Sequence, residues 1–132
     1  AVTPHAARLV DVAAAALDDV NADGANLLRS LLDYAPARAA LHAQVDAVVP
    51  RVLRFLDDDE QRRGSTAPRA RLDALRCLAA IADALPHAAL FPFRRTVAVA
   101  LRRPLDDDLR EVRRLAVLVR NDWLARFGGS IV

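Results

Sequence analysis

Hydrophobic residues recur along this chain at alternating spacings of three and four, with charged residues between them. This pattern predicts amphipathic α-helices, because one face of a helix repeats every 3.6 residues. The clearest apolar stripe comprises Leu109, Val112, Ala116, Val119 and Trp123. Taken along the whole chain, the pattern predicts six helices, near residues 5–19, 24–34, 40–56, 67–85, 92–103 and 107–127. The predicted fold class is therefore all-α.

A longer period lies on top of the helical one. Sliding the sequence by 49 to 50 residues brings Leu28 onto Leu78, Pro36 onto Pro86, Val48 onto Val97 and the acidic triplet 57–59 onto 106–108. After an apparent loop insertion at 60–67, Arg71 and Ala74 match Arg113 and Ala116 at an offset of 42. Periods of this length are typical of helical solenoids. We expect one domain over residues 1–132, built of about three helical hairpins at 4–35, 36–85 and 86–127.

Prolines and acidic residues indicate where these helices bend, end and begin. Pro50 falls inside the predicted helix 40–56, where it should cause a kink. Pro92 suits a first helical position, and Pro104 is expected to close the helix that begins there. The triplet 106–108 should cap the final helix. Kinked first helices, each followed by a second helix that carries arginine and alanine at set positions, are typical of HEAT repeats, so we predict a HEAT-repeat α-solenoid.

Composition and charge narrow the functional classes. All 19 cations are arginines, the formal net charge is +2, and residues 91–132 carry 9 arginines against 5 acids. Charge-free apolar runs are far too short for a membrane span. A basic end could meet nucleic-acid phosphates, but interleaved acids and an aromatic content of only 5% make an arginine-rich nucleic-acid-binding module the less favoured interpretation.

Candidate catalytic chemistry is sparse. His5, His42, His87 and Cys77 lie far apart in the sequence, so we expect no metal site. Cys77 falls within a predicted helix and is expected to be a small core residue. The four glycines do not fit a phosphate-binding loop. We therefore expect a protein that is not an enzyme, with no catalytic residues and no cofactor bound by this domain.

The end of the chain carries a more specific resemblance. Its motifs are Leu90–Arg94, Arg103–Asp107, Val112-Arg113, Ala116-Val117 and Arg120 followed by Trp123. On these residues, the segment 41–126 resembles the large HEAT-repeat adaptor of the cytosolic iron-sulfur assembly (CIA) targeting complex, also described as a nucleotide excision repair and transcription cofactor. The chain departs from that family at Asp108 and Leu109, where basic residues are usual, and at Leu115, where an acid is usual.

The resemblance implies a function in protein recognition. It implies a C-terminal domain of a longer solenoid, as the absence of methionine also suggests. Such a domain docks a MIP18-family (DUF59) protein, which also binds a WD40-propeller protein, and the complex delivers clusters to client apo-iron-sulfur proteins of DNA metabolism. Localisation would be cytoplasmic and nuclear, without membrane or direct nucleic-acid binding. A general HEAT-repeat scaffold or a transport-receptor fragment would share the same periodicity and is the alternative.

Charged positions gather around the last predicted inter-helix turn and the final helix. The residues predicted to bind a partner are Phe93, Arg94, Asp106, Asp107, Arg110, Arg113, Arg114 and Arg120. The alternative for the same residues is structural, because HEAT repeats often join neighbours through a turn aspartate and a following arginine. Trp123 continues the apolar stripe and is expected in the core rather than at an interface.

Overall fold

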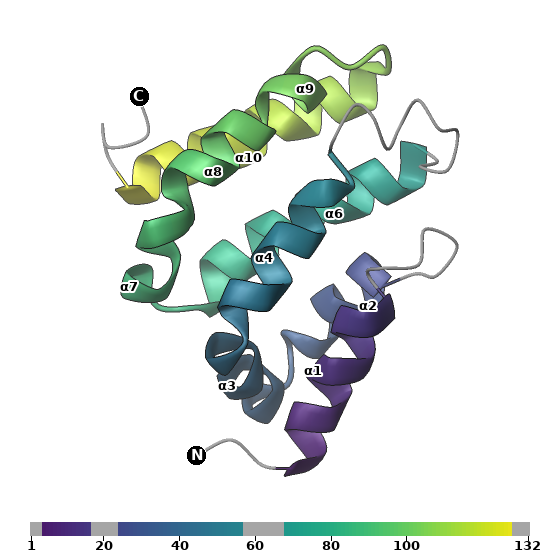
Figure 1. Ribbon diagram of the computed structural model, residues 1–132. Helices are drawn as coiled ribbons and strands as arrows, with labels where there is room; N and C mark the ends of the chain where they lie inside the picture. Colours follow the sequence, from purple (N-terminus) through teal and green to yellow (C-terminus); the bar gives the residue numbers. More distant parts are fainter. Residues whose placement is uncertain (1–3, 17–23, 57–67, 128–132) are drawn as a thin grey trace.

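The computed structural model describes residues 4–16, 24–56 and 68–127, which form two layers of helices and contain no strand (Figure 1). The first layer consists of α1 (Pro4–Ala16), α3 (Ala35–Ala43), α4 (Val45–Arg54), α7 (His87–Leu90), the 3-10 turn η1 (Phe91–Phe93), α8 (Arg94–Ala100) and α9 (Arg102–Leu105). The second layer consists of α2 (Gly24–Leu31), α6 (Pro68–Ala84) and α10 (Arg110–Phe127). The all-α prediction is confirmed.

Helices stack in chain order within each layer. In the second layer α2 contacts α6, and α6 contacts α10. Across the layers α1 packs on α2, α4 on α6, and α8 and α9 on α10. This succession of helical pairs, each in contact with its neighbours, is the arrangement of an α-solenoid. Within the described ranges, no helix is both long and apolar enough to cross a membrane.

The positions that the repeat superposes are buried in the same way. Three repeat-related pairs are fully buried: Leu28 with Leu78, Val48 with Val97, and Ala74 with Ala116. Each large apolar side chain withdrawn from water contributes roughly 1.5–3 kcal/mol of stabilisation, so these matched positions contribute to the stability of the fold. The small alanines let neighbouring helices approach closely. The core is thus continuous along the stack.

The predicted helix 40–56 is two helices, and its predicted kink is misplaced. Helix α3 already begins at Ala35, because Pro36 occupies the first turn, where no backbone N–H is needed. The interruption lies at Gln44, which ends α3 and precedes α4 with φ −113° and ψ 13°. Pro50 lies inside α4, in its second turn. The chain therefore bends upstream of the proline and not at it.

The predicted helix 92–103 is a series of short pieces from His87 to Leu105. Pro92 stands at the start of η1, as expected for a first helical position. Pro104 does not close the helix: it is buried within α9, and the break lies earlier, at Leu101. A proline removes the hydrogen bond to the carbonyl four residues before it, which here belongs to Ala100, the last residue of α8.

The final helix begins at Arg110 and not at 107. Its buried stripe is confirmed over Val112, Ala116, Val119 and Trp123, but Leu109 precedes the helix and is 40% exposed. The triplet 57–59 and the insertion 60–67 lie outside the described residues.

Candidate protein-interaction surface

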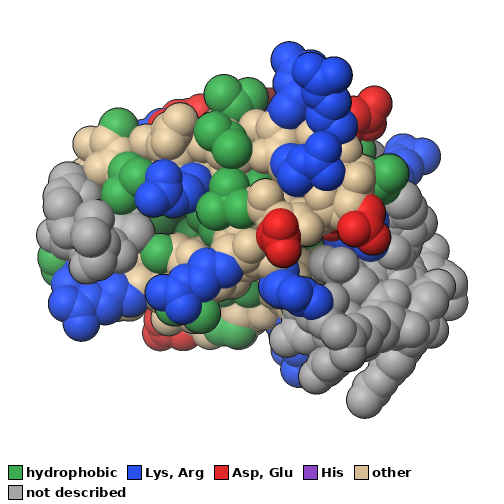
Figure 2. All heavy atoms as spheres, turned by 90° about the horizontal axis from the view of Figure 1, so that it is seen from above, with side chains coloured by type: hydrophobic (Ala, Val, Ile, Leu, Met, Phe, Trp, Pro, Cys, Tyr) green, Lys and Arg blue, Asp and Glu red, His purple; other side chains and the backbone are tan. Residues whose placement is uncertain are grey.

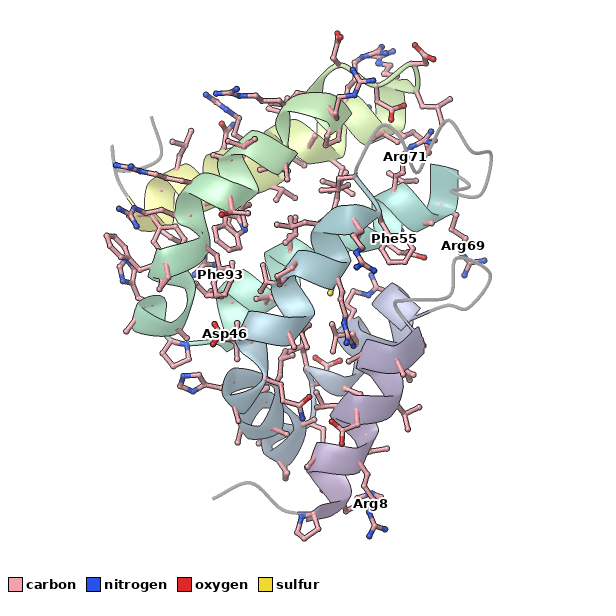
Figure 3. The ribbon with its side chains drawn as sticks, viewed as in Figure 1. Arg8, Asp46, Phe55, Arg69, Arg71 and Phe93 are labelled. Carbon is pink, nitrogen blue, oxygen red and sulfur yellow. The ribbon has the colours of Figure 1, made fainter. Side chains whose placement is uncertain are left out.

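The turn before α10 is built around Asp107. Its Oδ2 lies 3.1 Å from Nε of Arg71 on α6, and its Oδ1 accepts a hydrogen bond from the backbone N–H of Leu109 at 2.9 Å. The second contact closes a turn within the loop, so Asp107 does not cap α10 in the predicted way. Both side chains of the ion pair are nearly buried, at 12% exposure for Arg71 and 5% for Asp107. Figure 3 shows Arg71 at the end of α6 next to this turn.

Arg113, near the start of α10, stabilises the same loop. Its Nη1 donates to the carbonyl oxygens of Asp107 at 2.7 Å and Asp108 at 3.0 Å. Arg71 and Arg113 are repeat-related, and Asp107 joins one hairpin to the next. Asp107 and Arg113 therefore have the structural role that the sequence analysis gave as the alternative to partner binding. Asp107 is buried, whereas Arg113 is exposed apart from these bonds.

A second ion pair joins α6 and α10 at their other ends. The guanidinium of Arg126 contacts the carboxylate of Asp83 on α6, and its Nε donates to Oδ1 of Asp122 at 3.1 Å. Arg126 is 33% exposed and Asp83 is 76% exposed. Ion pairs thus join α6 to the hairpin of α10 at both ends of their contact. In the first pair α6 supplies the arginine, whereas in the second pair α6 supplies the aspartate.

Phe93 and Arg94 belong to a different part of the surface. Phe93 is half-buried and packs against the core, pointing toward the interior (Figure 3). The guanidinium carbon of Arg94 lies 3.7 Å from the ring centre of Phe91, and Nη1 donates to the Phe91 carbonyl at 2.9 Å. This stacked geometry is a cation–π contact, which holds Arg94 against its own turn.

The eight predicted contact residues do not form one cluster. Asp106, Asp107, Arg110, Arg113 and Arg114 gather at the start of α10. Arg94 lies beside Phe91, whose ring centre is 6.3 Å from that of Phe127, the last residue of α10. An 18-residue helix is about 27 Å long, so the two groups lie at opposite ends of α10. Arg120 lies between them along the helix.

Two groups of residues in this region escaped the sequence analysis. One is an aromatic cluster, in which the Phe127 ring centre lies 4.8 Å from His87 and 5.2 Å from Trp123. Trp123 is 1% exposed, which confirms its assignment to the core. The other group is apolar and exposed: Val99, Val117 and Leu118 lie on α8 and α10. A helical projection of α10 reveals this second group, since these residues lie off the buried stripe.

Two polar residues of α6, Asp73 and Cys77, are buried. Asp73 is buried, and its charge is paired with Arg69 at 3.7 Å and Arg76 at 3.3 Å. Burial raises the pKa of the Cys77 thiol to about 12, so the nucleophilic thiolate is negligible near neutral pH. Among the described side chains, no group of three or more metal-ligating residues converges.

A hollow of about 720 Å³ lies between α2 and the end of α6. Its charged lining consists of Arg29, Arg38, Asp33 and Asp83. Arg38 donates to the carbonyl of Leu32 at 2.8 Å, and Asp83 is held by Arg126. These charges balance one another, and the contacts hold the hairpins together rather than forming an acid–base or nucleophile pair.

No family model matches the chain, but known proteins resemble it. The chain is 39% identical over 85 residues to the MMS19 nucleotide excision repair protein homolog of Danio rerio, which covers 64% of the chain and 7% of the relative. The Homo sapiens homolog is 36% identical over 96 residues, 73% of the chain and 8% of the relative. The Arabidopsis thaliana homolog is 40% identical over 60 residues, 46% of the chain and 5% of the relative. Such identity to the same protein of three different organisms shows that the chain belongs to the MMS19 family, whose members extend well beyond the part that it matches.

Proposed function

We propose that this chain is a protein-binding part of an MMS19-type adaptor that acts in nucleotide excision repair and cytosolic iron-sulfur cluster assembly. The observation that carries the proposal is the identity to MMS19 homologues over up to 96 residues. The stacked helical hairpins support it, because solenoids present long surfaces that recognise other proteins without catalytic groups. In this proposal the chain is not an enzyme and binds no cofactor.

The proposed partners are a MIP18-family protein and a WD40-propeller protein, with client apo-iron-sulfur proteins of DNA metabolism bound through the assembly. The proposed location is the cytoplasm and the nucleus, with no membrane and no direct nucleic-acid contact. Support for these partners comes from the motifs around the last turn and α10, where the resemblance to the CIA adaptor is most specific.

Burial separates the predicted contact residues into two roles. Asp106, Arg110, Arg114 and Arg120 are exposed and can meet a partner directly. Asp107 is buried against Arg71, so its proposed contribution is to shape the turn that presents the others. Phe93 and Arg94 lie near the far end of α10 and would require a partner that spans the length of this helix.

Co-elution on size exclusion with the MIP18-family and WD40 proteins, at moderate and at high salt, tests this function. We expect a stoichiometric complex that is weakened when Arg110 and Arg114 are both changed to glutamate. Arg8→Glu is the control for added negative charge, because Arg8 is exposed on α1 at the opposite end of the molecule (Figure 3). Absence of any complex with a folded chain would overturn the proposed partners and favour a general scaffold.

A nucleic-acid-binding role is the second candidate, favoured only by the 9 arginines in residues 91–132. Binding of this kind weakens steeply with salt, because each phosphate contact releases a counterion. A flat salt dependence, or no shift of a labelled duplex or single strand, would exclude it.

A further inference from the structure

Among the described residues, nothing covers the side of the hairpin of α8, α9 and α10 that faces away from α6. We call it the end face and define it by two stripes of residues. The first is Arg113, Val117, Arg120 and Leu124 on α10, and the second is Arg95 and Val99 on α8 with Arg102 at the start of α9. In α10, each residue of the first stripe directly follows one of the buried stripe. Asp122 and Arg126 lie on the opposite flank of α10, where Arg126 reaches Asp83 of α6. The α10 stripe therefore points away from α6.

The corresponding stripe of α6 shows what such a face is used for. The offset of 42 residues relates the α10 stripe to Arg71, Leu75, Leu78 and Ala82. Arg71 reaches Asp107 of the next hairpin, so this stripe faces α10. Leu75 and Leu78 are fully buried there, and Ala82 is 3% exposed. On α6 the stripe thus combines an apolar packing surface with one arginine, Arg71, which pairs with a carboxylate of the next hairpin.

The α10 stripe keeps this design but adds positive charge. Val117 is 45% exposed and Leu124 is half-buried, so the apolar positions remain apolar. Arg120 stands where α6 has Leu78, and it is exposed. In the second stripe, Val99 of α8 is 57% exposed and stands between Arg95 of the same helix and Arg102 of α9, which are both exposed. Neither stripe contains an acid. Figure 2 shows hydrophobic side chains and arginines on this side of the molecule, with a few acidic side chains beside them.

Two kinds of cover are disfavoured by this chemistry. An apolar hairpin like those inside the stack would bury Arg120 without a carboxylate, and an unpaired buried charge is strongly destabilising. A second copy meeting the same face symmetrically would place arginines against arginines. A cover that satisfies the end face must bring apolar side chains together with carboxylates.

Resting on the proposed function, we propose that the end face binds an acidic amphipathic helix of a partner protein. The apolar side of that helix packs on Val117, Leu124 and Val99. Its carboxylates pair with Arg120 and Arg102, as Asp107 pairs with Arg71 inside the stack. Arg113 adds to the positive field while it holds the turn before α10.

Two synthetic helical peptides of about 18 residues test this proposal. The first carries leucines on one side and glutamates flanking them, and the second replaces the glutamates by glutamines. We expect fluorescence anisotropy to show preferential binding of the acidic peptide. Arg120→Glu with Arg102→Glu should weaken it about tenfold or more, because close charge pairs contribute strongly to binding. Arg8→Glu is the control for charge reversal, since Arg8 is exposed on α1 outside the end face, and should stay within about twofold.

A third variant separates charge from shape. Arg120→Leu restores the residue that α6 has at this position, so it should reduce the preference for the acidic peptide while keeping the apolar packing surface. Unchanged helical content and melting temperature must accompany each variant. Equal binding of both peptides, or equal binding by the charge-reversed and control variants, would overturn the proposal. A dimer that light scattering detects and Arg120→Glu abolishes would also overturn it.

The two proposals fail in different ways. Discrimination between the peptides that depends on Arg120, without a complex with the MIP18-family and WD40 proteins, would support the end face and overturn the proposed partners. A complex that forms equally well with the charge-reversed variants, with no peptide discrimination, would overturn the end-face proposal and leave the proposed function in place.

Discussion

The two ends of the contact between α6 and α10 use the same chemistry in different surroundings. At one end, Arg71 and Asp107 are 12% and 5% exposed, and Asp107 also accepts the N–H of Leu109. At the other end, Arg126 and Asp83 are 33% and 76% exposed. Water screens the exposed pair, whereas losing either partner of the buried pair leaves an uncompensated charge in the interior. Burial, and not the number of ion pairs, therefore decides which end contributes more to the stability of the contact between the two hairpins.

The acidic triplet makes the same point within three residues. Asp107 is buried, while its neighbours Asp106 and Asp108 are exposed. Only the middle carboxylate faces Arg71, so identical side chains serve structure at one position and are available for recognition at the next.

The largest expected effect comes from Asp107→Ala. The substitution leaves Arg71 without its carboxylate and the Leu109 N–H without its acceptor, so we expect a loss of about 3 kcal/mol in the free energy of unfolding. Urea denaturation followed by circular dichroism measures this loss. Asp106→Ala is the matched control and should change the free energy by less than about 0.5 kcal/mol. Equal effects of the two substitutions would contradict the assigned role of Asp107.

A double-mutant cycle compares the two ion pairs directly. Combining Arg71→Ala with Asp107→Ala should reveal a coupling energy of about 2 kcal/mol, because the pair is nearly buried. The same cycle on Arg126 and Asp83 should give less than about 0.5 kcal/mol. If the exposed pair showed the larger coupling, the ranking of the two ends would be reversed.

Cys77, on α6 between the two ends, offers a probe that depends on pH. Its folded pKa of about 12 lies above the ordinary value of 9.0, so the unfolded thiol loses its proton first as pH rises. The associated stability is complete below about pH 9 and is lost as pH approaches 12, by roughly 1 kcal/mol at pH 10. Cys77→Ala should fall less steeply over this interval in denaturation measured at several pH values. Parallel slopes of the two proteins would mean that the thiol is not shielded.

The smallest effect is expected for Arg126→Ala. Its contacts with Asp83 and Asp122 lie partly in water, so the unfolding free energy should drop by less than about 0.5 kcal/mol. Raising the salt concentration to about 1 M should remove most of that difference, since screening then acts within about 3 Å. A loss of unfolding free energy comparable to that of Asp107→Ala would show that the exposed ion pair stabilises the stack as much as the buried one.

The sequence by itself determined the helical character of the chain and the apolar face of its longest helices. The predicted helix 67–85 is α6 within a residue at each end, and Trp123 is buried as expected. These features depend on spacing within one helix, which the order of residues specifies locally. The motifs around α10 likewise sufficed to identify the family.

Only the tertiary structure decided which charges are buried and which surfaces remain open. Asp107 meets Arg71 because stacking brings together distant residues of two consecutive hairpins, and the same stacking leaves Val117 and Arg120 exposed. It also placed Arg94 and Arg114 toward opposite ends of α10, although the sequence suggested one cluster. Spacing along a helix sets the direction of a side chain, but the energy of a charge depends on the neighbours and the water around it, and packing alone supplies those.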